Sequence, residues 1–182
     1  YGKNVYNNDE IGAVLNTLKK STQMGKSVLE FESKISKMFG KKYGLMVNSG
    51  SSALILALKA LSIKEGSEVI TPCLNFGTTV SSILLNNLVP ILVDVNVQTL
   101  QIDIGLIEKK ISKKTKAIVP VHFTGYMTNM PKLLKLSKKY KLPIIEDACQ
   151  SILGEINKKK AGSWGNFGAF SLHPLKNINV WS

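Results

Sequence analysis

One lysine of this sequence differs from the others in its surroundings. Lys176 lies five residues after Ser171 and two after Pro174, among Leu, Ile, Val and Trp, whereas most other lysines stand in polar clusters such as 158–160. A lysine in a partly desolvated pocket loses its proton more easily, so it can attack a carbonyl carbon and form a Schiff base. The alternative is a lysine that extends from a loop into water, its stem lying along apolar neighbours.

A candidate phosphate site comes after the apolar residues 45–47. The segment 48–52 reads Asn-Ser-Gly-Ser-Ser and leads into a predicted helix. Gly50 permits close approach of a ligand to the backbone, Ser51 offers a hydroxyl, and the free amides of a helix N-terminus attract anions. A serine-rich turn that only caps the helix is the alternative.

Aromatic, basic and acidic side chains come after three further apolar segments. Phe76 lies beside Gly77 in the loop after residues 68–70, where its ring either faces a planar ligand or fills the core. His122 comes after residues 118–121 and is either catalytic or structural. Asp147 comes after residues 143–146, and a carboxylate there is costly unless it has a cationic partner, although a helix-capping Asp is the alternative.

Together these side chains match the parts of one cofactor. Ligands of open α/β sheets bind beyond the carboxyl ends of the strands. At those ends the sequence offers a phosphate site, to which Ser171 adds a hydroxyl, and an aromatic ring for stacking. It also offers a carboxylate for a protonated ring nitrogen and a lysine for an aldehyde. The joint match is more specific than any single residue and predicts pyridoxal 5′-phosphate.

Helices and short apolar strands alternate along the chain and would position these residues. Strands are predicted at 44–47, 68–70, 89–93, 117–121, 143–146, 154–156 and 168–172. Helices are predicted at 11–18, 28–39, 51–61, 78–85, 104–111 and 131–140. In the first helix, Ile11, Val14, Leu15 and Leu18 are expected to face a core. This alternation predicts an α/β fold, with a mostly parallel sheet flanked by helices on both faces.

The composition excludes several classes of protein. A chain of 182 residues suits one substantial domain. No apolar run approaches the ~20 residues of a membrane helix, and the N-terminus lacks a secretory pattern. Cys73 and Cys149 are too few and too far apart for a disulfide scaffold or a metal cluster, which favours a reducing cytoplasm.

The net charge of +12 suggests nucleic-acid binding as a rival function. All 24 basic residues are lysine, however, and arginine is the usual bidentate reader of guanine and phosphate. The lysines fall at predicted helix ends and turns rather than along one stripe. The lack of arginine also means that no side chain of this sequence can hold a substrate carboxylate bidentately.

The sequence resembles the DegT–StrS family of pyridoxal-phosphate-dependent sugar aminotransferases, which have the aspartate-aminotransferase-like fold. The resemblance runs over nearly the whole chain, through motifs at 22–25, 31–32, 47–54, 71–78, 120–125, 145–150, 162–165 and 170–177. Asn75 and His173 depart from the family pattern, in which Thr and an aromatic residue are common at these positions. A dehydratase branch of the family has His at the Schiff-base position, and Lys176 argues against that branch.

The resemblance implies a role for each candidate residue. Lys176 would be the catalytic residue and would hold the cofactor as a Schiff base. Asp147 would pair with the pyridinium nitrogen, Gln150 would approach the ring oxygen, and Phe76 would stack on the ring. The phosphate would be held by Gly50, Ser51 and Ser171. His122 and His173 are candidate substrate residues, and no metal is expected.

The resemblance also implies what the whole protein does. Residues 1–182 would form an N-terminal arm and most of the large cofactor-binding domain of a fold-type-I enzyme, with the small C-terminal domain missing after Ser182. The intact protein would be a cytoplasmic homodimer with shared active sites. It would move an amino group, from glutamate, to a keto group of a nucleotide-linked sugar for cell-surface polysaccharide or amino-sugar biosynthesis. The alternative is a catalytically inactive protein of the same fold that binds the cofactor and acts as a regulator or scaffold.

Overall fold

The structure is a computed structural model that describes residues 6–20, 23, 25–173 and 176. The chain divides into two compact units, the first up to Met46 and the second from Val47 onward. Five residues of the motifs named above lie outside the described residues: Thr22, Met24, Pro174, Leu175 and Asn177.

The first unit contains helices α1 (Asn8–Lys20) and α2 (Lys26–Met38). The N-terminus of α1 is capped reciprocally, because Asn7 Oδ1 accepts the N–H of Asp9 while Glu10 accepts the N–H of Asn7. The expectation that this helix faces a core is wrong. Its apolar residues are all more than half exposed, namely Ile11, Val14, Leu15 and Leu18. Helical spacing defines an apolar face, but it does not provide a layer that covers the face.

The predicted strand at 44–47 is also absent, although the α2 prediction is confirmed. The segment 44–46 lies along α2, where Met46 donates its backbone N–H to Glu32 Oε1 at 2.7 Å. A Cβ on Gly44 would lie 2.6 Å from the carbonyl oxygen of Glu32. The segment therefore packs against a helix, with its amide bound to a side chain instead of a neighbouring strand.

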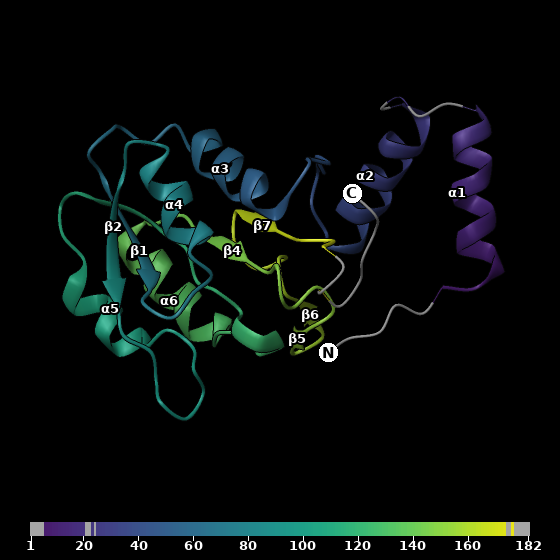
Figure 1. Ribbon diagram of the computed structural model, residues 1–182. Coiled ribbons are helices and arrows are strands. Elements are labelled where there is room, and N and C mark those ends of the chain that lie inside the picture. The colour runs from purple at the N-terminus through teal and green to yellow at the C-terminus, as the bar shows by residue number, and fades with distance from the viewer. Residues whose placement is uncertain (1–5, 21–22, 24, 174–175, 177–182) are drawn as a thin grey trace. The chain divides into compact units, whose positions relative to one another are not determined.

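The second unit is built on parallel strands (Figure 1). These strands are β1 (Glu68–Pro72), β2 (Val89–Val93), β3 (Thr115–Ile118), β4 (Ile145–Asp147) and β7 (Phe167–Ala169). One ladder has the order β2-β1-β3 and another pairs β4 with β7. Parallel bridges from Ile118 to Ile144 and from Val121 to Asp147 link the two ladders. All these carboxyl ends therefore meet at one edge, and the predicted sheet is confirmed.

Helices cover both faces of this sheet, with α3 and α4 on one side and α5 and α6 on the other (Figure 1). The helices are α3 (Gly50–Ala60), α4 (Thr78–Leu84), α5 (Ile104–Lys110) and α6 (Met130–Tyr140), with a short 3₁₀ turn η1 (Phe123–Gly125). Successive strand residues alternate between the two cores: Val69 and Ile145 pack with α3 and α4, whereas Ile70 and Ile144 pack with α5 and α6. This alternation explains why continuous apolar strands occur in the sequence.

A small hairpin lies outside the parallel sheet. It consists of β5 (Glu155–Ile156) and β6 (Lys159–Lys160), paired antiparallel. Asn157 and Lys158 at its turn both have positive φ angles, of 52° and 62°. Positive φ at both central residues is typical of a type I′ hairpin turn.

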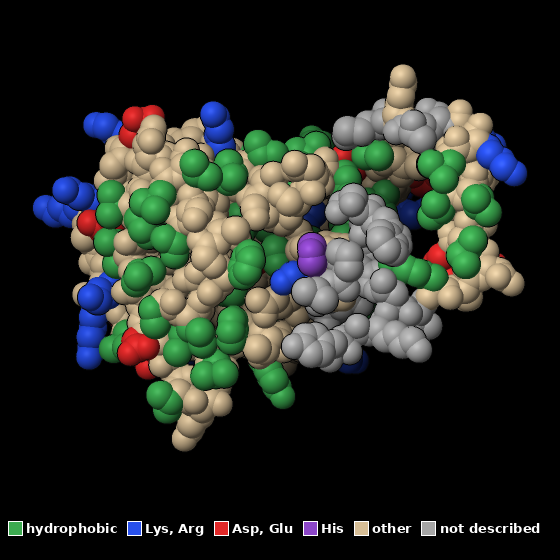
Figure 2. Space-filling model, viewed as in Figure 1, with side chains coloured by type: hydrophobic (Ala, Val, Ile, Leu, Met, Phe, Trp, Pro, Cys, Tyr) green, Lys and Arg blue, Asp and Glu red, His purple; other side chains and the backbone are tan. Residues whose placement is uncertain are grey.

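Lysine side chains are spread over the surface. Three helices carry lysine pairs in their last turns, at 19–20, 109–110 and 138–139, where the helix dipole favours positive charge. On the face seen in Figure 2, the lysines do not form one continuous patch. Within the described residues, no helix combines the length and apolar character needed to cross a membrane.

Candidate active site

The N-terminus of α3 meets two other loops at the carboxyl edge of the sheet. A Cβ on Gly50 would lie 2.9 Å from Cys149 Sγ, 3.0 Å from Ser171 Cβ and 3.2 Å from the carbonyl oxygen of Phe170. Ser49 caps the helix by accepting the N–H of Ser52. The first amides of a helix have no partner within it, so the predicted phosphate residues lie around a helix N-terminus that Ser171 approaches closely.

Asp147 ends β4 and is only 4% exposed. Its Oδ2 accepts a hydrogen bond of 2.7 Å from the Thr79 hydroxyl, and its Oδ1 accepts one of 3.3 Å from the N–H of Cys149. No ion pair to this carboxylate is present among the described residues. A buried carboxylate with only neutral donors is costly, and a cationic ligand at this point would compensate its charge.

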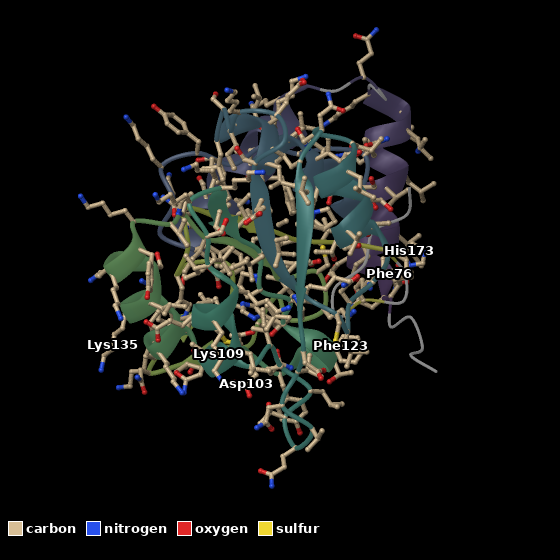
Figure 3. All side chains as sticks on the ribbon, turned by 90° about the vertical axis from the view of Figure 1, so that its left-hand side faces the viewer. Phe76, Asp103, Lys109, Phe123, Lys135 and His173 are labelled. Atoms are coloured by element: carbon tan, nitrogen blue, oxygen red, sulfur yellow. The ribbon has the colours of Figure 1, made fainter. Side chains whose placement is uncertain are left out.

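Lys176 lies beside the ring of Phe76, with 5.7 Å between its Nζ and the ring centroid. Phe76 is 62% exposed, so it does not fill the core and its ring is available to a ligand. The backbone N–H of Lys176 donates to the carbonyl of His173, which places the exposed His173 close to the lysine. In Figure 3 the side chains of Phe76 and His173 project from the same edge of the molecule.

Cys149 lies between the Asp147 carboxylate and the N-terminus of α3. Burial raises the pKa of its thiol, the neighbouring Asp147 adds to the rise, and the charge of Lys176 opposes it. Its Sγ lies next to Gly50, as described above. The Asp147 carboxylate and the α3 N-terminus therefore both lie next to Cys149, although they are far apart in the sequence.

Gln150 is held by the turn η1. Its side-chain carbonyl accepts the backbone N–H of Thr124 at 2.8 Å. Thr124 has a φ of 55°, in the left-handed region, so the turn directs this amide toward the glutamine. With its oxygen bound in this way, the side-chain NH₂ of Gln150 is the end that can donate to a ligand.

His122 is fully buried, and both of its ring nitrogens are bound within the protein. The N–H of Thr128 donates to Nδ1, so Nδ1 carries no proton and Nε2 donates to Glu146 Oε2 at 3.0 Å. Contact with a substrate would require exposed atoms, which His122 lacks. These contacts favour a structural role for His122 over a catalytic one. Of the two histidines, only His173 has exposed surface that a substrate could contact.

Two residues of this region were not singled out from the sequence as site residues. Thr79 touches the Asp147 carboxylate, and Glu146 accepts backbone hydrogen bonds from Gly162, Trp164 and Gly165. Both are polar residues at buried positions next to strand or helix ends. A polar residue at a position predicted to be buried could therefore have been singled out from the sequence, because a buried polar group must be hydrogen-bonded.

Comparison with known proteins gives a consistent result. The sequence profile of the DegT/DnrJ/EryC1/StrS aminotransferase family matches residues 5–181. The chain is 38% identical, over 86% of its length and 42% of the relative's, to a UDP-N-acetyl-3-dehydro-alpha-D-glucosamine 3-aminotransferase of Acidithiobacillus ferrooxidans. It is 36% identical, over 95% of its length and 40% of the relative's, to a 3-oxo-glucose-6-phosphate:glutamate aminotransferase of Bacillus subtilis.

A solved structure shows the same fold. The GDP-4-keto-6-deoxy-D-mannose-3-dehydratase of E. coli with bound hydrated PLP superposes with a TM-score of 0.92 at 31% identity, over 97% of this chain and 47% of that one. The chain thus spans less than half the length of each of these relatives. It has the α/β fold of the fold-type-I enzymes, as the sequence predicted.

Proposed function

Because the chain belongs to the DegT/DnrJ/EryC1/StrS aminotransferase family, we propose that the intact protein is an aminotransferase that uses pyridoxal 5′-phosphate. It moves an amino group, from glutamate, to a keto group of a nucleotide-linked sugar. The observation that carries this proposal is the buried Asp147 carboxylate, which has no cationic partner among the described residues and shares a sheet edge with Lys176 and the α3 N-terminus.

The residues at this edge fit the cofactor. The buried charge of Asp147 suits a protonated ring nitrogen, and the exposed ring of Phe76 suits a planar ligand. Gln150 can donate to the ring oxygen, and Lys176 supplies the amine for the aldehyde. The phosphate would bind at the N-terminus of α3, where Gly50 and Ser51 lie in the first turn and Ser171 is close by.

The bound cofactor supplies an electron-accepting ring that stabilises negative charge on the carbon beside the transferred amino group. The protein's own residues orient the reacting groups and transfer protons. Lys176 takes a proton from the α-carbon of the donor and later returns one, as general base and then general acid. Its amine lies beside the exposed ring of Phe76, on which the cofactor would stack.

The names of the relatives support the two substrates. One relative is named for glutamate as a reactant and another for a UDP-linked keto-sugar. The intact protein would act in cell-surface polysaccharide or amino-sugar biosynthesis, in the cytoplasm. We also propose that it is a homodimer with shared active sites. A carboxylate clamp for glutamate would come from outside these 182 residues, which contain no arginine.

The test is Lys176→Ala in the full-length protein, with Lys135→Ala, an exposed lysine on α6, as the control. Loss of the amine should reduce amino transfer by about a thousandfold, within the range expected for a general acid–base group. Borohydride reduction followed by peptide mapping should attach the cofactor to Lys176 in the wild type and the control only. Unchanged transfer, or a cofactor label on another lysine, would refute the assigned role.

A second measurement distinguishes an enzyme from a protein that only binds the cofactor. Glutamate alone should convert the bound cofactor to its amine form, and this conversion is visible in the absorption spectrum. Bound cofactor whose spectrum stays constant with glutamate would support the regulatory or scaffold alternative instead.

A further inference from the structure

We propose that Thr79 is a positioning residue for Asp147: its hydroxyl fixes the plane of the carboxylate so that the carboxylate faces the ring nitrogen of the cofactor. This inference rests on the proposed function, because it assigns Asp147 to the ring nitrogen. It concerns a residue that does not itself touch the cofactor.

The contact is short, buried and between groups far apart in the sequence. Thr79 is fully buried, and its Oγ1 donates to Asp147 Oδ2 at 2.7 Å across a separation of 68 residues. This distance lies at the edge of the range for charge-assisted hydroxyl–carboxylate hydrogen bonds. The other bond to the carboxylate, from the N–H of Cys149, is longer at 3.3 Å. The threonine hydroxyl is therefore the stronger of the two restraints.

The backbone of Asp147 is already fixed, so its two side-chain torsions are the remaining freedom. Its N–H donates to the carbonyl of Pro120, and its own carbonyl accepts the N–H of His122. The terminal torsion of an aspartate is broad and has no strong intrinsic preference. One donor on each carboxylate oxygen, Thr79 on Oδ2 and Cys149 on Oδ1, selects a single orientation.

The segment that contains Thr79 also contains a second predicted cofactor residue, Phe76. The backbone N–H of Thr79 donates to the carbonyl of Phe76 at 2.8 Å. The segment 76–79, which leads into α4, therefore carries both the Thr79 hydroxyl on the buried carboxylate and the exposed Phe76 ring beside Lys176. Two predicted cofactor residues, Asp147 and Phe76, are thus linked through this one short segment.

The experiment compares three variants of the full-length protein. Thr79→Val removes the hydroxyl while keeping the side-chain shape, and Thr79→Ser restores it. Thr115→Val is the matched control, because Thr115 is also a buried threonine whose hydroxyl donates to a carboxylate, that of Glu68, at 3.2 Å. Thr115 and Glu68 begin β3 and β1, at the opposite edge of the sheet.

We expect Thr79→Val to weaken cofactor binding about tenfold, as measured by titrating the apoprotein in the absence of substrates. The kcat should fall while the KM for glutamate changes less than about twofold, because Thr79 does not reach the substrate. Thr79→Ser should lie within about twofold of wild type in both quantities. Thr115→Val should lower the unfolding midpoint and leave the cofactor dissociation constant unchanged.

Wild-type cofactor affinity in Thr79→Val would overturn the inference, as would equal weakening in Thr115→Val. If Thr79→Val does not fold, Thr79→Ala replaces it in the same comparison. Failure of the proposed function looks different, since a wild-type protein that takes up no cofactor would refute both ideas. Borohydride labelling of Lys176 with unchanged affinity in Thr79→Val would refute only the role of Thr79.

Discussion

At the scale of single residues, Gly50 determines how closely α3 approaches the rest of the site. A Cβ on it would lie 2.9 Å from Cys149 Sγ and 3.2 Å from the carbonyl oxygen of Phe170. At such distances a neighbour has to shift: the Cys149 side chain, the helix N-terminus or the loop with Phe170 and Ser171. Glycine is needed here because of the close approach, not because of an unusual backbone torsion.

Gly50→Ala in the full-length protein should therefore weaken cofactor binding about tenfold and destabilise the fold by about 1–3 kcal/mol, the usual cost of overpacking. Cofactor titration and urea unfolding measure the two effects. The control is Gly12→Ala, because Gly12 lies within α1 and a Cβ there meets nothing within 4 Å. This change should stabilise its helix by about 0.5–1 kcal/mol without affecting cofactor binding. A Gly50→Ala protein with wild-type affinity would contradict the crowding argument.

At the scale of elements, one carboxylate holds the loop that leads to the lysine segment. Glu146 Oε1 accepts the N–H groups of Trp164 and Gly165 at 2.7 and 2.6 Å, and Oε2 accepts that of Gly162 at 2.9 Å. Gly162 packs directly on the ring of Phe170, the residue before Ser171. Glu146 therefore connects the end of β4 to the loop at 162–165, and its neighbour Asp147 faces the opposite side.

Replacing Glu146 with Gln should destabilise the protein by roughly 3 kcal/mol, because a buried charge-assisted network loses its central acceptor. Either orientation of the amide turns its NH₂ toward N–H donors: those of Trp164 and Gly165, or those of Gly162 and His122. Urea unfolding of the full-length protein measures the loss.

The control for this change is Glu108→Gln, since the Glu108 carboxylate is exposed on α5 and bonded to Lys139 and Tyr140. Exposed pairs of this kind contribute little to stability, so the unfolding midpoint of this variant should not move. Superimposable unfolding curves for the wild type and Glu146→Gln would show that the loop is held by other contacts.

At the scale of the whole molecule, these 182 residues contain no arginine side chain, and none of the described residues covers the apolar face of α1. Without arginine, no side chain of this sequence can grip the carboxylates of glutamate bidentately. The apolar face of α1 is more than half exposed, an arrangement that costs free energy unless another surface covers it. The chain spans less than half the length of its relatives, so under the proposed function we expect residues outside these 182 to bind the glutamate carboxylates and to cover α1.

A polypeptide of these 182 residues by itself should therefore show no amino transfer, whereas the full-length protein should turn over. The assay uses glutamate with a panel of keto-sugar nucleotides, and both proteins are tested at equal concentrations with added cofactor. Turnover by the 182-residue piece at a rate comparable to the full-length protein would show that the site is complete without further chain.

Much of the fold could be predicted because the local pattern of apolar residues determines which segments form strands and helices. Continuous apolar strands alternating with helices specify a parallel sheet covered on both faces, and a parallel sheet brings its carboxyl ends to one edge. For that reason, Asp147 at the end of β4 and the loop with Phe76 after β1 could be placed at this edge from the sequence. The exposed α1 face and the missing strand at 44–47 could not be predicted, because each depends on which surface lies opposite.

The sequence by itself determined that Asp147 and the loop with Phe76 come at the ends of strands, because strand periodicity and chain order decide which residues follow each strand. Only the tertiary structure decided where the side chains point. It exposed Phe76, buried both nitrogens of His122, and placed the Thr79 hydroxyl on Asp147. The physical reason is that side-chain direction and burial depend on packing between segments tens of residues apart, such as 79 and 147, and no local pattern encodes such a contact.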